Sequence, residues 1–299
     1  MMNLTRRQLV AAASATPALA AGFPLVPFGP HRISRLIVGG NPISGNSHVS
    51  EELSREMMDY FSAANVKRLL ADCERAGINT WQARGDRHIQ RLLREYRNDG
   101  GRIQWIAQTA SELADIPRHI QDVAAQKPIA IYLHGTMTDR LWAAGRITEA
   151  RETLRQIRDA GVRVGLATHI PEVIDWVEER GWDVDFYMTS LYHLSRSQAD
   201  AARLAGPGLR PPGSHFYDPD REAMLRRVAR TARQCLIFKV YGASRHCASA
   251  ADMREALRLV AASAKPHDAV IVGMFPKHKD QVAENRRLFL EAFGAPVRS

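Results

Sequence analysis

Two residues with titratable side chains stand where apolar segments of this sequence end. Residues 129–133 form a β-branched apolar run that stops at His134 and Gly135. A short run of this kind predicts a strand buried on both faces, and in parallel α/β folds the chemistry lies at the carboxyl ends of the strands. His134 is therefore a candidate for acid–base catalysis. The alternative is a histidine that caps a strand and satisfies a loop.

Lys239 interrupts a second apolar segment, residues 236–241. Lysine is rarely buried without a partner. If its side chain points into a site, desolvation and a nearby cation would lower its pKa. It would then suit the role of a base, a Schiff-base nucleophile or an oxyanion stabiliser. If it points outward, it only extends between surface helices.

Short apolar segments alternate with amphipathic segments through most of the chain. Strands are expected at 36–41, 78–82, 103–108, 129–133, 162–168, 184–189, 236–241 and 269–273. Helices are expected at 51–76, from about 84 to 96, and at 111–125, 146–160, 171–180, 220–233, 250–263 and 278–293. Eight strands that are each followed by a helix predict an α/β fold, a single (β/α)8 TIM barrel over 33–295. An open doubly wound sheet is the alternative.

Residues 206–219 break this alternation, because Gly-Pro-Gly and Pro-Pro-Gly sustain neither helix nor strand. We interpret them as a long loop. The loop would either cover the site as a lid or lie on the surface.

The first 21 residues resemble a twin-arginine signal peptide. Arg6 and Arg7 precede an alanine-rich apolar run, and residues 18–20 (ALA) fit a signal-peptidase site. The run is too short for a spanning helix, so we expect no stable membrane anchor. We expect the twin-arginine export machinery as a partner and a periplasmic or secreted location.

The chain of 299 residues has 41 Lys and Arg against 32 Asp and Glu, a formal charge of +9. The arginines are scattered along the predicted helices beside acidic neighbours, which indicates solvated helix faces rather than a basic stripe. We therefore expect a small-molecule substrate and no nucleic-acid partner.

Five segments together resemble the aldo/keto reductase family. They are 34–45 (SRLIVGGNPISG), 76–83 (AGINTWQA), 131–135 (IYLHG), 162–169 (VRVGLATH) and 270–285 (VIVGMFPKHKDQVAEN). The resemblance covers most of the chain after residue 33. It implies the barrel, a small carbonyl or sugar-like substrate, and hydride transfer from NAD(P) to a carbonyl that a tyrosine protonates.

The family pairs that tyrosine with an aspartate, a lysine and a histidine. By this resemblance the histidine is His134, the aspartate position holds Gln82 and the lysine position holds Gln108. Arg84 and Arg87 stand where the tyrosine is expected. The reductase proton donor is therefore missing. We expect Gln82 and Gln108 to orient the substrate, and Arg84 and Arg87 to bind an anionic group on it.

The residues expected to bind the cofactor match the family at one end of the cofactor and depart from it at the other. Ala167, Thr168 and Thr189 stand where polar residues would hold the carboxamide, and Lys239 replaces the stacking aromatic. A cation stacks poorly on an oxidised nicotinamide ring. The closing motif is matched better, and it implies cofactor-binding roles for three residues, Gln281, Glu284 and Asn285. The cofactor is left open, with NAD(P) possible.

Other polar residues are placed near the predicted strand ends. His169, Tyr192 and Tyr241 are candidate substrate-binding residues. His134 and His169, joined by His215 or Asp218, could in principle hold a divalent metal. Because no local ligand spacing supports that set, we predict no metal site.

Three functions are compatible with these residues. The first is proton transfer next to a carbonyl, of lyase or isomerase type, with His134 as acid–base and Lys239 stabilising or forming the enolate-like intermediate. The second is NAD(P)H-dependent carbonyl reduction with an altered proton donor. The third is a non-catalytic barrel that binds a small molecule.

Overall fold

The computed structural model describes residues 22–205 and 216–294. Its centre is a closed barrel of eight parallel strands, each hydrogen-bonded to its two neighbours. The strands are β3 (Leu36–Gly39), β4 (Thr80–Arg84), β5 (Gln104–Gln108), β6 (Ala130–Leu133), β7 (Arg163–Thr168), β8 (Phe186–Ser190), β9 (Gln234–Phe238) and β10 (Ala269–Gly273). The last strand pairs with the first, in a register that sets Val270 against Leu36. The predicted (β/α)8 barrel is confirmed, and the open sheet is excluded.

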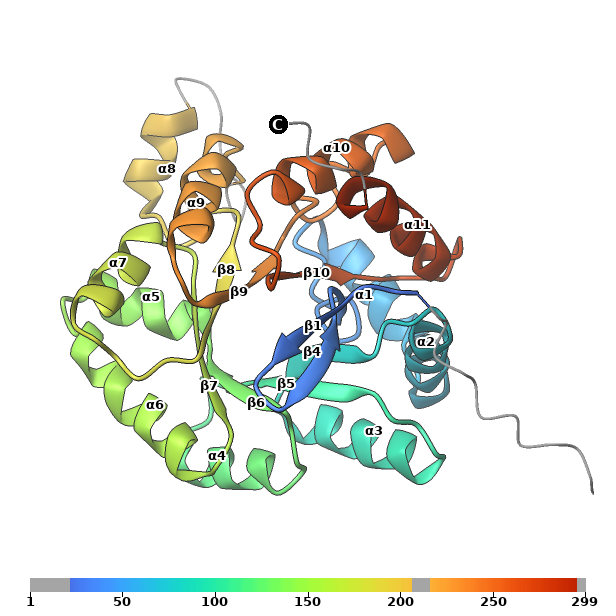
Figure 1. The fold of residues 1–299 in the computed structure, drawn as a ribbon, viewed down its shortest axis with the longest axis horizontal. Helices are drawn as coiled ribbons and strands as arrows, with labels where there is room; N and C mark the ends of the chain where they lie inside the picture. Colours follow the sequence, from blue (N-terminus) through green and yellow to red (C-terminus); the bar gives the residue numbers. More distant parts are fainter. Residues whose placement is uncertain (1–21, 206–215, 295–299) are drawn as a thin grey trace, which may run out of the picture.

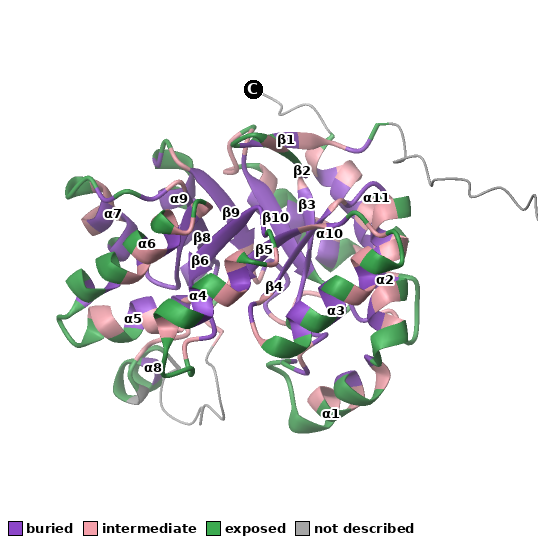
Figure 2. Ribbon diagram, turned by 90° about the horizontal axis from the view of Figure 1, so that it is seen from below, coloured by how far each residue is buried: buried purple, intermediate pink, exposed green. Residues whose placement is uncertain are grey.

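Helices surround this barrel, and their outward faces carry the exposed residues (Figures 1 and 2). They are α1 (Glu51–Tyr60), α2 (Ala63–Arg75), α3 (Arg87–Asn98), α4 (Ile116–Ala124), α5 (Gly135–Ala143), α6 (Ala150–Asp159), α7 (Pro171–Glu179), α8 (Gln198–Ala205), α9 (Pro219–Arg230), α10 (Ala250–Ala261) and α11 (Gln281–Phe293). A short 3₁₀ turn spans Ile147–Glu149. In α3, Ile89, Leu92, Leu93 and Tyr96 are buried. This is the helical spacing that turns one face to the sheet.

The apolar core has two parts, one between the strands and the helices and one inside the barrel. The inner part contains Phe186 of β8 and Tyr132 of β6. Gly165 of β7 lies between the Phe186 ring and the Cβ atom of Tyr132, and a Cβ atom on it would come within 2.3 Å of that ring. The bulk of the neighbouring rings therefore requires glycine at this point of the barrel wall.

An antiparallel hairpin precedes the barrel and was not predicted. Its strands are β1 (Leu25–Phe28) and β2 (His31–Ser34). Phe28 and Ile33 are fully buried in the inner core, so the hairpin closes one end of the barrel. In Figure 2 it lies at the end opposite to α1 and α8.

Several predicted boundaries are wrong in detail. The helix expected over 51–76 is two helices, because Phe61 ends α1 and the Ser62 side chain caps α2 by accepting from the Asn65 amide. Helix α5 was not predicted. The strand expected over 236–241 ends at Phe238, because Lys239 has a φ of 62° and leaves the extended conformation.

Two predicted segments fall wholly or partly outside the described residues. The signal peptide over 1–21 is one of them, and residues 206–215 of the loop predicted over 206–219 are the other. The described end of that loop, residues 216–218, leads directly into α9. Across 22–205 and 216–294, no helix is both long and apolar enough to cross a bilayer.

Candidate active site

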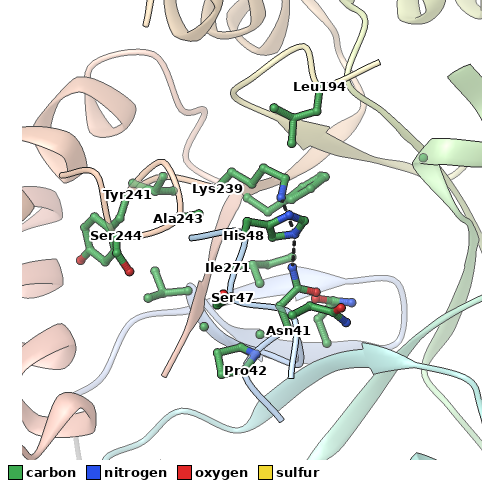
Figure 3. A pocket seen from close by; sticks show the side chains of 18 of the residues that line it. Asn41, Pro42, Ser47, His48, Leu194, Lys239, Tyr241, Ala243, Ser244 and Ile271 are labelled. Atoms are coloured by element: carbon green, nitrogen blue, oxygen red, sulfur yellow. Dashed lines mark hydrogen bonds between the residues drawn. The ribbon is translucent and has the colours of Figure 1, made fainter. Parts of the chain in front are cut away.

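A cavity of about 950 Å³ opens at the carboxyl ends of the strands, away from the hairpin. One arm of it lies over β4 to β7 and includes Gln82, Gln108, His134 and His169. The other arm runs past the loop after β9 to the start of α11. Figure 3 shows Lys239 of the loop after β9 beside His48 of the loop after β3. This volume is ample for a small metabolite.

Gln82 and Gln108 are joined through a tyrosine on the floor of the cavity. Gln82 Nε2 donates to Tyr132 Oη at 2.7 Å, and Tyr132 Oη donates to Gln108 Oε1 at 2.9 Å. Burial raises the pKa of Tyr132. Both hydrogen-bonding directions of the phenol are therefore used, and its proton is held tightly. The free amide atoms, Gln82 Oε1 and Gln108 Nε2, remain for a ligand.

His134 directly follows β6 and occupies the position before the first turn of α5. Its Nδ1 lies 2.8 Å from Ser111 Oγ, and its backbone amide donates to Thr109 Oγ1 at 3.1 Å. Burial, followed by the charges of His169 and Arg84, lowers the pKa of His134 to about 4. The ring is neutral near pH 7, so it acts there through a neutral N–H or lone pair.

His169 follows β7 and forms a pair with Asp139, a residue of α5 that the sequence did not single out. His169 Nδ1 donates to Asp139 Oδ2 at 2.7 Å. The carboxylate is 1% exposed and also accepts from the hydroxyls of Thr168 at 2.6 Å and Ser195 at 2.5 Å. Burial opposes ionisation of Asp139, but the hydrogen bonds and charge of His169, together with these hydroxyls, lower its pKa overall.

The Asp139 bond fixes which nitrogen of His169 faces a ligand. A carboxylate only accepts hydrogen bonds, so Nδ1 carries a proton, and in the neutral ring Nε2 carries the lone pair. Within the described residues, no group bonds Nε2, and His169 lines the cavity. This geometry, an oriented imidazole with a free lone pair, is that of a general base.

Lys239 directly follows β9, which is two strands from β7 in the barrel, and it contacts a histidine. Its Nζ is 3.2 Å from His48 Nε2, and Asn41 Nδ2 is 3.3 Å from the same atom (Figure 3). Both neighbours are donors, so His48 accepts on Nε2 and carries its proton on Nδ1. Burial, followed by the charges of Lys239, of His169 when it is protonated and of Arg245, lowers the pKa of His48 to about 4.

Arg245 adds a second cation beside Lys239. The two side chains lie over the ring of Phe216, Arg245 at 3.9 Å and Lys239 at 5.6 Å from its centroid. Arg245 donates to the Gly242 carbonyl at 2.9 Å. In the part of the chain that the structure describes, neither cation forms an ion pair with a carboxylate. An unneutralised pair of cations at a cavity attracts an anionic group.

Backbone strain is concentrated at the same place. Five described non-glycine residues have a positive φ, and four of them, His48, Lys239, Ala243 and Ser244, line the cavity. Side chains with a Cβ disfavour this conformation by about 1–2 kcal/mol each. Strain of this kind is retained where it positions functional groups.

The two predicted arginines lie in different surroundings. Arg84 ends β4, lines the cavity and pairs with Asp86 at 3.5 Å and with Glu112. Arg87 is exposed at the start of α3 and does not line the cavity. Only Arg84 is therefore positioned to reach a ligand.

Tyr192 also lies off the cavity lining. Its hydroxyl donates to Asp218 at 2.9 Å and lies 2.9 Å from His246 Nε2. This cluster anchors the start of α9 to the loop after β9. Among the described residues, no three His, Cys, Asp or Glu side chains lie close enough together to hold a metal ion. His215 lies outside the described residues.

The second arm holds the three residues of the closing motif and Tyr241. Gln281 accepts from the Phe275 amide at 2.7 Å, and Glu284 pairs with Lys279 at 2.7 Å. Asn285 accepts from Tyr241 Oη at 2.9 Å. All three residues line this arm, and each already has a protein partner.

Comparisons with known proteins support the architecture. No protein-family model and no curated protein matches the chain. Among solved structures, the aldo-keto reductase AKR11C1 from Bacillus halodurans in its holo form has a TM-score of 0.54 at 11% identity, over 89% of each chain. The apo form of Gox0644 also has a TM-score of 0.54 at 11% identity, over 91% of this chain and 89% of that one.

A third structure comes from a different class of enzyme. A truncated 3-deoxy-D-arabino-heptulosonate 7-phosphate synthase from Thermotoga maritima has a TM-score of 0.51 at 11% identity, over 90% of each chain. At this identity the likenesses show the fold alone. The chain is therefore a TIM barrel similar in fold to these enzymes, and its chemistry must be argued from its own site.

Proposed function

We propose that this barrel catalyses proton transfer next to the carbonyl of a small carbonyl or sugar-like compound, as a lyase or isomerase does. One observation carries the proposal: His169, which lines the cavity, is oriented by a buried carboxylate at 2.7 Å, and its Nε2 has no hydrogen bond within the described residues. The base is thus His169, a residue predicted to bind substrate, with Asp139 as its positioning residue.

The negative charge that develops on the carbonyl oxygen needs a partner. Lys239 provides a cation without a carboxylate of its own, and the neutral ring of His134 provides a hydrogen bond. Lys239 therefore keeps the stabilising role expected from the sequence, whereas His134, expected as the acid–base, is assigned a hydrogen-bonding role instead. The free amide groups of Gln82 and Gln108 suit hydroxyl or carbonyl groups of the same substrate.

The tyrosines around the cavity favour this chemistry over reduction. Burial raises the pKa of Tyr132, Tyr192 and Tyr241, and each phenol is hydrogen-bonded to a neighbour. A reductase of the expected type needs a phenol whose pKa is lowered toward neutral. None of these three phenols meets that requirement.

Hydrogen–deuterium exchange tests the proposal without a known substrate. The purified protein is incubated in D2O with pyruvate, dihydroxyacetone and a set of aldoses, and loss of the C–H signal beside the carbonyl is followed by NMR. We expect catalysed exchange that His169→Asn lowers by about 10²–10⁴-fold. The matched control is His88→Asn on the exposed face of α3. Exchange that survives His169→Asn would remove the proposed base.

A second candidate function is carbonyl reduction with NAD(P)H and an altered proton donor. It is favoured by the arm of the cavity that reaches Gln281, Glu284 and Asn285. The strand ends do not fit this chemistry. Lys239 stands where an aromatic residue would stack on the nicotinamide ring. Among the described residues, Tyr132 and Tyr241 line the cavity, and burial raises the pKa of both.

Fluorescence titration with NADPH and NADH separates the two candidates. Saturable micromolar binding, worth about 8 kcal/mol, requires a formed site and would favour the reductase. Absence of binding leaves proton transfer. If the exchange assay is also negative, the remaining hypothesis is a barrel that binds a small molecule without converting it.

The proposal includes export by the twin-arginine machinery, to the periplasm or beyond. It is supported by Arg6 and Arg7 before the alanine-rich run. Replacing both arginines by lysine should retain the protein in the cytoplasmic fraction. Recovery of the double variant outside the cytoplasm would contradict this route.

A further inference from the structure

We infer that Lys239 is a covalent nucleophile, whose amine condenses with the substrate carbonyl to form a Schiff base. The inference rests on the proposed function and deepens it, since it defines the substrates as aldehydes or ketones with a hydrogen on the adjacent carbon. This inference gives Lys239 a covalent role, in addition to the stabilisation that its charge alone would provide.

The backbone aims this lysine at the cavity. β9 ends at Phe238, and Lys239, the next residue, takes a φ of 62°, which only residues at special positions adopt. Its side chain crosses the mouth toward His48 (Figure 3), with Nζ 3.2 Å from Nε2. Because Nε2 accepts this hydrogen bond, it orients the nitrogen without adding a negative charge.

The charge environment distinguishes Lys239 from the other lysines. Of the six lysines in the sequence, four pair with a carboxylate: Lys67, Lys265, Lys277 and Lys279. Lys127 lies on the surface after α4. Lys239 instead shares the Phe216 ring with Arg245. A neighbouring cation without a carboxylate favours the neutral amine, which is the nucleophilic form.

The pKa agrees with this geometry. Burial, followed by the charge of Arg245, lowers the pKa of Lys239 to about 8. At pH 7 roughly one molecule in ten would then hold the amine neutral, against fewer than one in a thousand for an ordinary lysine.

The covalent step balances without an oxidant or a reductant. The neutral Nζ attacks the carbonyl carbon, and an N–C bond forms. The carbonyl oxygen then leaves as water, with one proton from the nitrogen and one from solvent. The resulting iminium keeps one N–H and draws electrons from the adjacent C–H bond. His169 Nε2 takes that proton, which leaves a neutral enamine on Lys239.

Reductive trapping tests the inference on the wild-type protein. The protein is incubated at pH 7 with pyruvate or dihydroxyacetone and cyanoborohydride, and adducts are located by peptide mass spectrometry. Lys279, in the same cavity but paired with Glu284, and the surface residue Lys127 serve as internal controls. We expect initial labelling of Lys239 to exceed both by about 100-fold, in line with its amine fraction. Equal labelling would overturn the inference.

Two variants separate this inference from the proposed function. In His169→Asn, trapping at Lys239 should persist while exchange is lost, which supports both. In Lys239→Arg, the cation stays but the nucleophile is gone, so both trapping and exchange should be lost. If Lys239→Arg retains exchange, the Schiff base is overturned and proton transfer stands. If wild type is trapped but shows no exchange with any probe, the Schiff base stands and the proposed function fails.

Discussion

Lys265 and Lys239 lie at opposite ends of β9 and have opposite surroundings. At the closed end, Lys265 Nζ donates to Asp268 at 2.8 Å and to the Val228 carbonyl at 2.7 Å. Asp268 is almost fully buried and also accepts from the Cys235 amide at 2.7 Å. At the mouth, the hydrogen-bond partner of Lys239 is a neutral histidine, and its nearest charged neighbour is another cation.

The backbone shows the same contrast. The hairpin turn at the closed end uses Gly29 for its positive φ of 61°, whereas the loop at the mouth uses Ala243 and Ser244 at 52° and 71°. At Lys265 and Gly29, the closed end thus pairs its charge and places glycine at the positive φ. At Lys239, Ala243 and Ser244, the mouth does neither, which is the trade of stability for function that active sites show.

The largest expected effect is that of losing the carboxylate at the mouth. Asp139→Asn should lower the catalysed exchange rate by about 10³-fold, because an amide no longer fixes the proton on His169 Nδ1. The exchange assay on folded protein measures it. Ser195→Ala, which removes one hydroxyl from the same carboxylate, is the milder control. A loss below about tenfold for Asp139→Asn would place the base elsewhere.

Loss of the carboxylate at the closed end should act on stability instead. Asp268→Asn leaves Lys265 without its anion, and breaking a buried ion pair costs about 3–5 kcal/mol of unfolding free energy. Urea denaturation gives this value. Exchange per folded molecule should stay within about twofold of wild type. If Asp268→Asn were as stable as wild type but impaired in exchange, the purely structural role assigned to Asp268 would be contradicted.

Lys239→Met should change the pH dependence of stability. The folded-state pKa of about 8 lies below the ordinary value of 10.5, so between these values the unfolded chain binds more protons. The stability contributed by this residue therefore rises with pH over that window. The gain from Lys239→Met should be largest below about pH 8 and vanish above about pH 10.5. A gain that does not depend on pH, in paired denaturation curves at pH 7 and 10, would contradict the shift.

The smallest expected effects concern the backbone. Ala243→Gly should stabilise the protein by up to about 1 kcal/mol, because glycine adopts a positive φ without strain. Gly29→Ala should destabilise it by about 1 kcal/mol, since it introduces that strain and a Cβ 2.6 Å from the Arg163 side chain. Thermal unfolding of both variants reports the difference. If both variants shifted the melting temperature in the same direction, the backbone strain assigned to Ala243 and its absence at Gly29 would be contradicted.

The sequence predicted the barrel because buried parallel strands are apolar along their whole length. The run that ends at His134 is an example. The hairpin escaped prediction because Pro27 and the polar residues His31 and Arg32 obscure its two short strands. The helix expected at 51–76 was not divided, because Phe61 and Ser62 continue its composition although they end α1 and cap α2.

Only some of the residues of the site could be predicted from the sequence. His134, Gln82, Gln108 and Lys239 stand at strand ends, and the structure brings all four to the cavity. Asp139 carries no local signal, because it pairs with His169 thirty residues further on, through the packing of α5 against β7. His48 escaped for a similar reason, since only barrel closure brings the loop after β3 to Lys239.

That closure also orders the assembly of the chain. β3 pairs with β4 on one side and with β10 on the other, so the seam joins Leu36 to Val270, which lie near opposite ends of the described chain. Contacts this distant in sequence form slowly, and a chain interrupted before residue 269 presents two unpaired strand edges, which invite association. We therefore expect the ring to close late in folding, and the contact of Lys239 with His48 to form together with that seam.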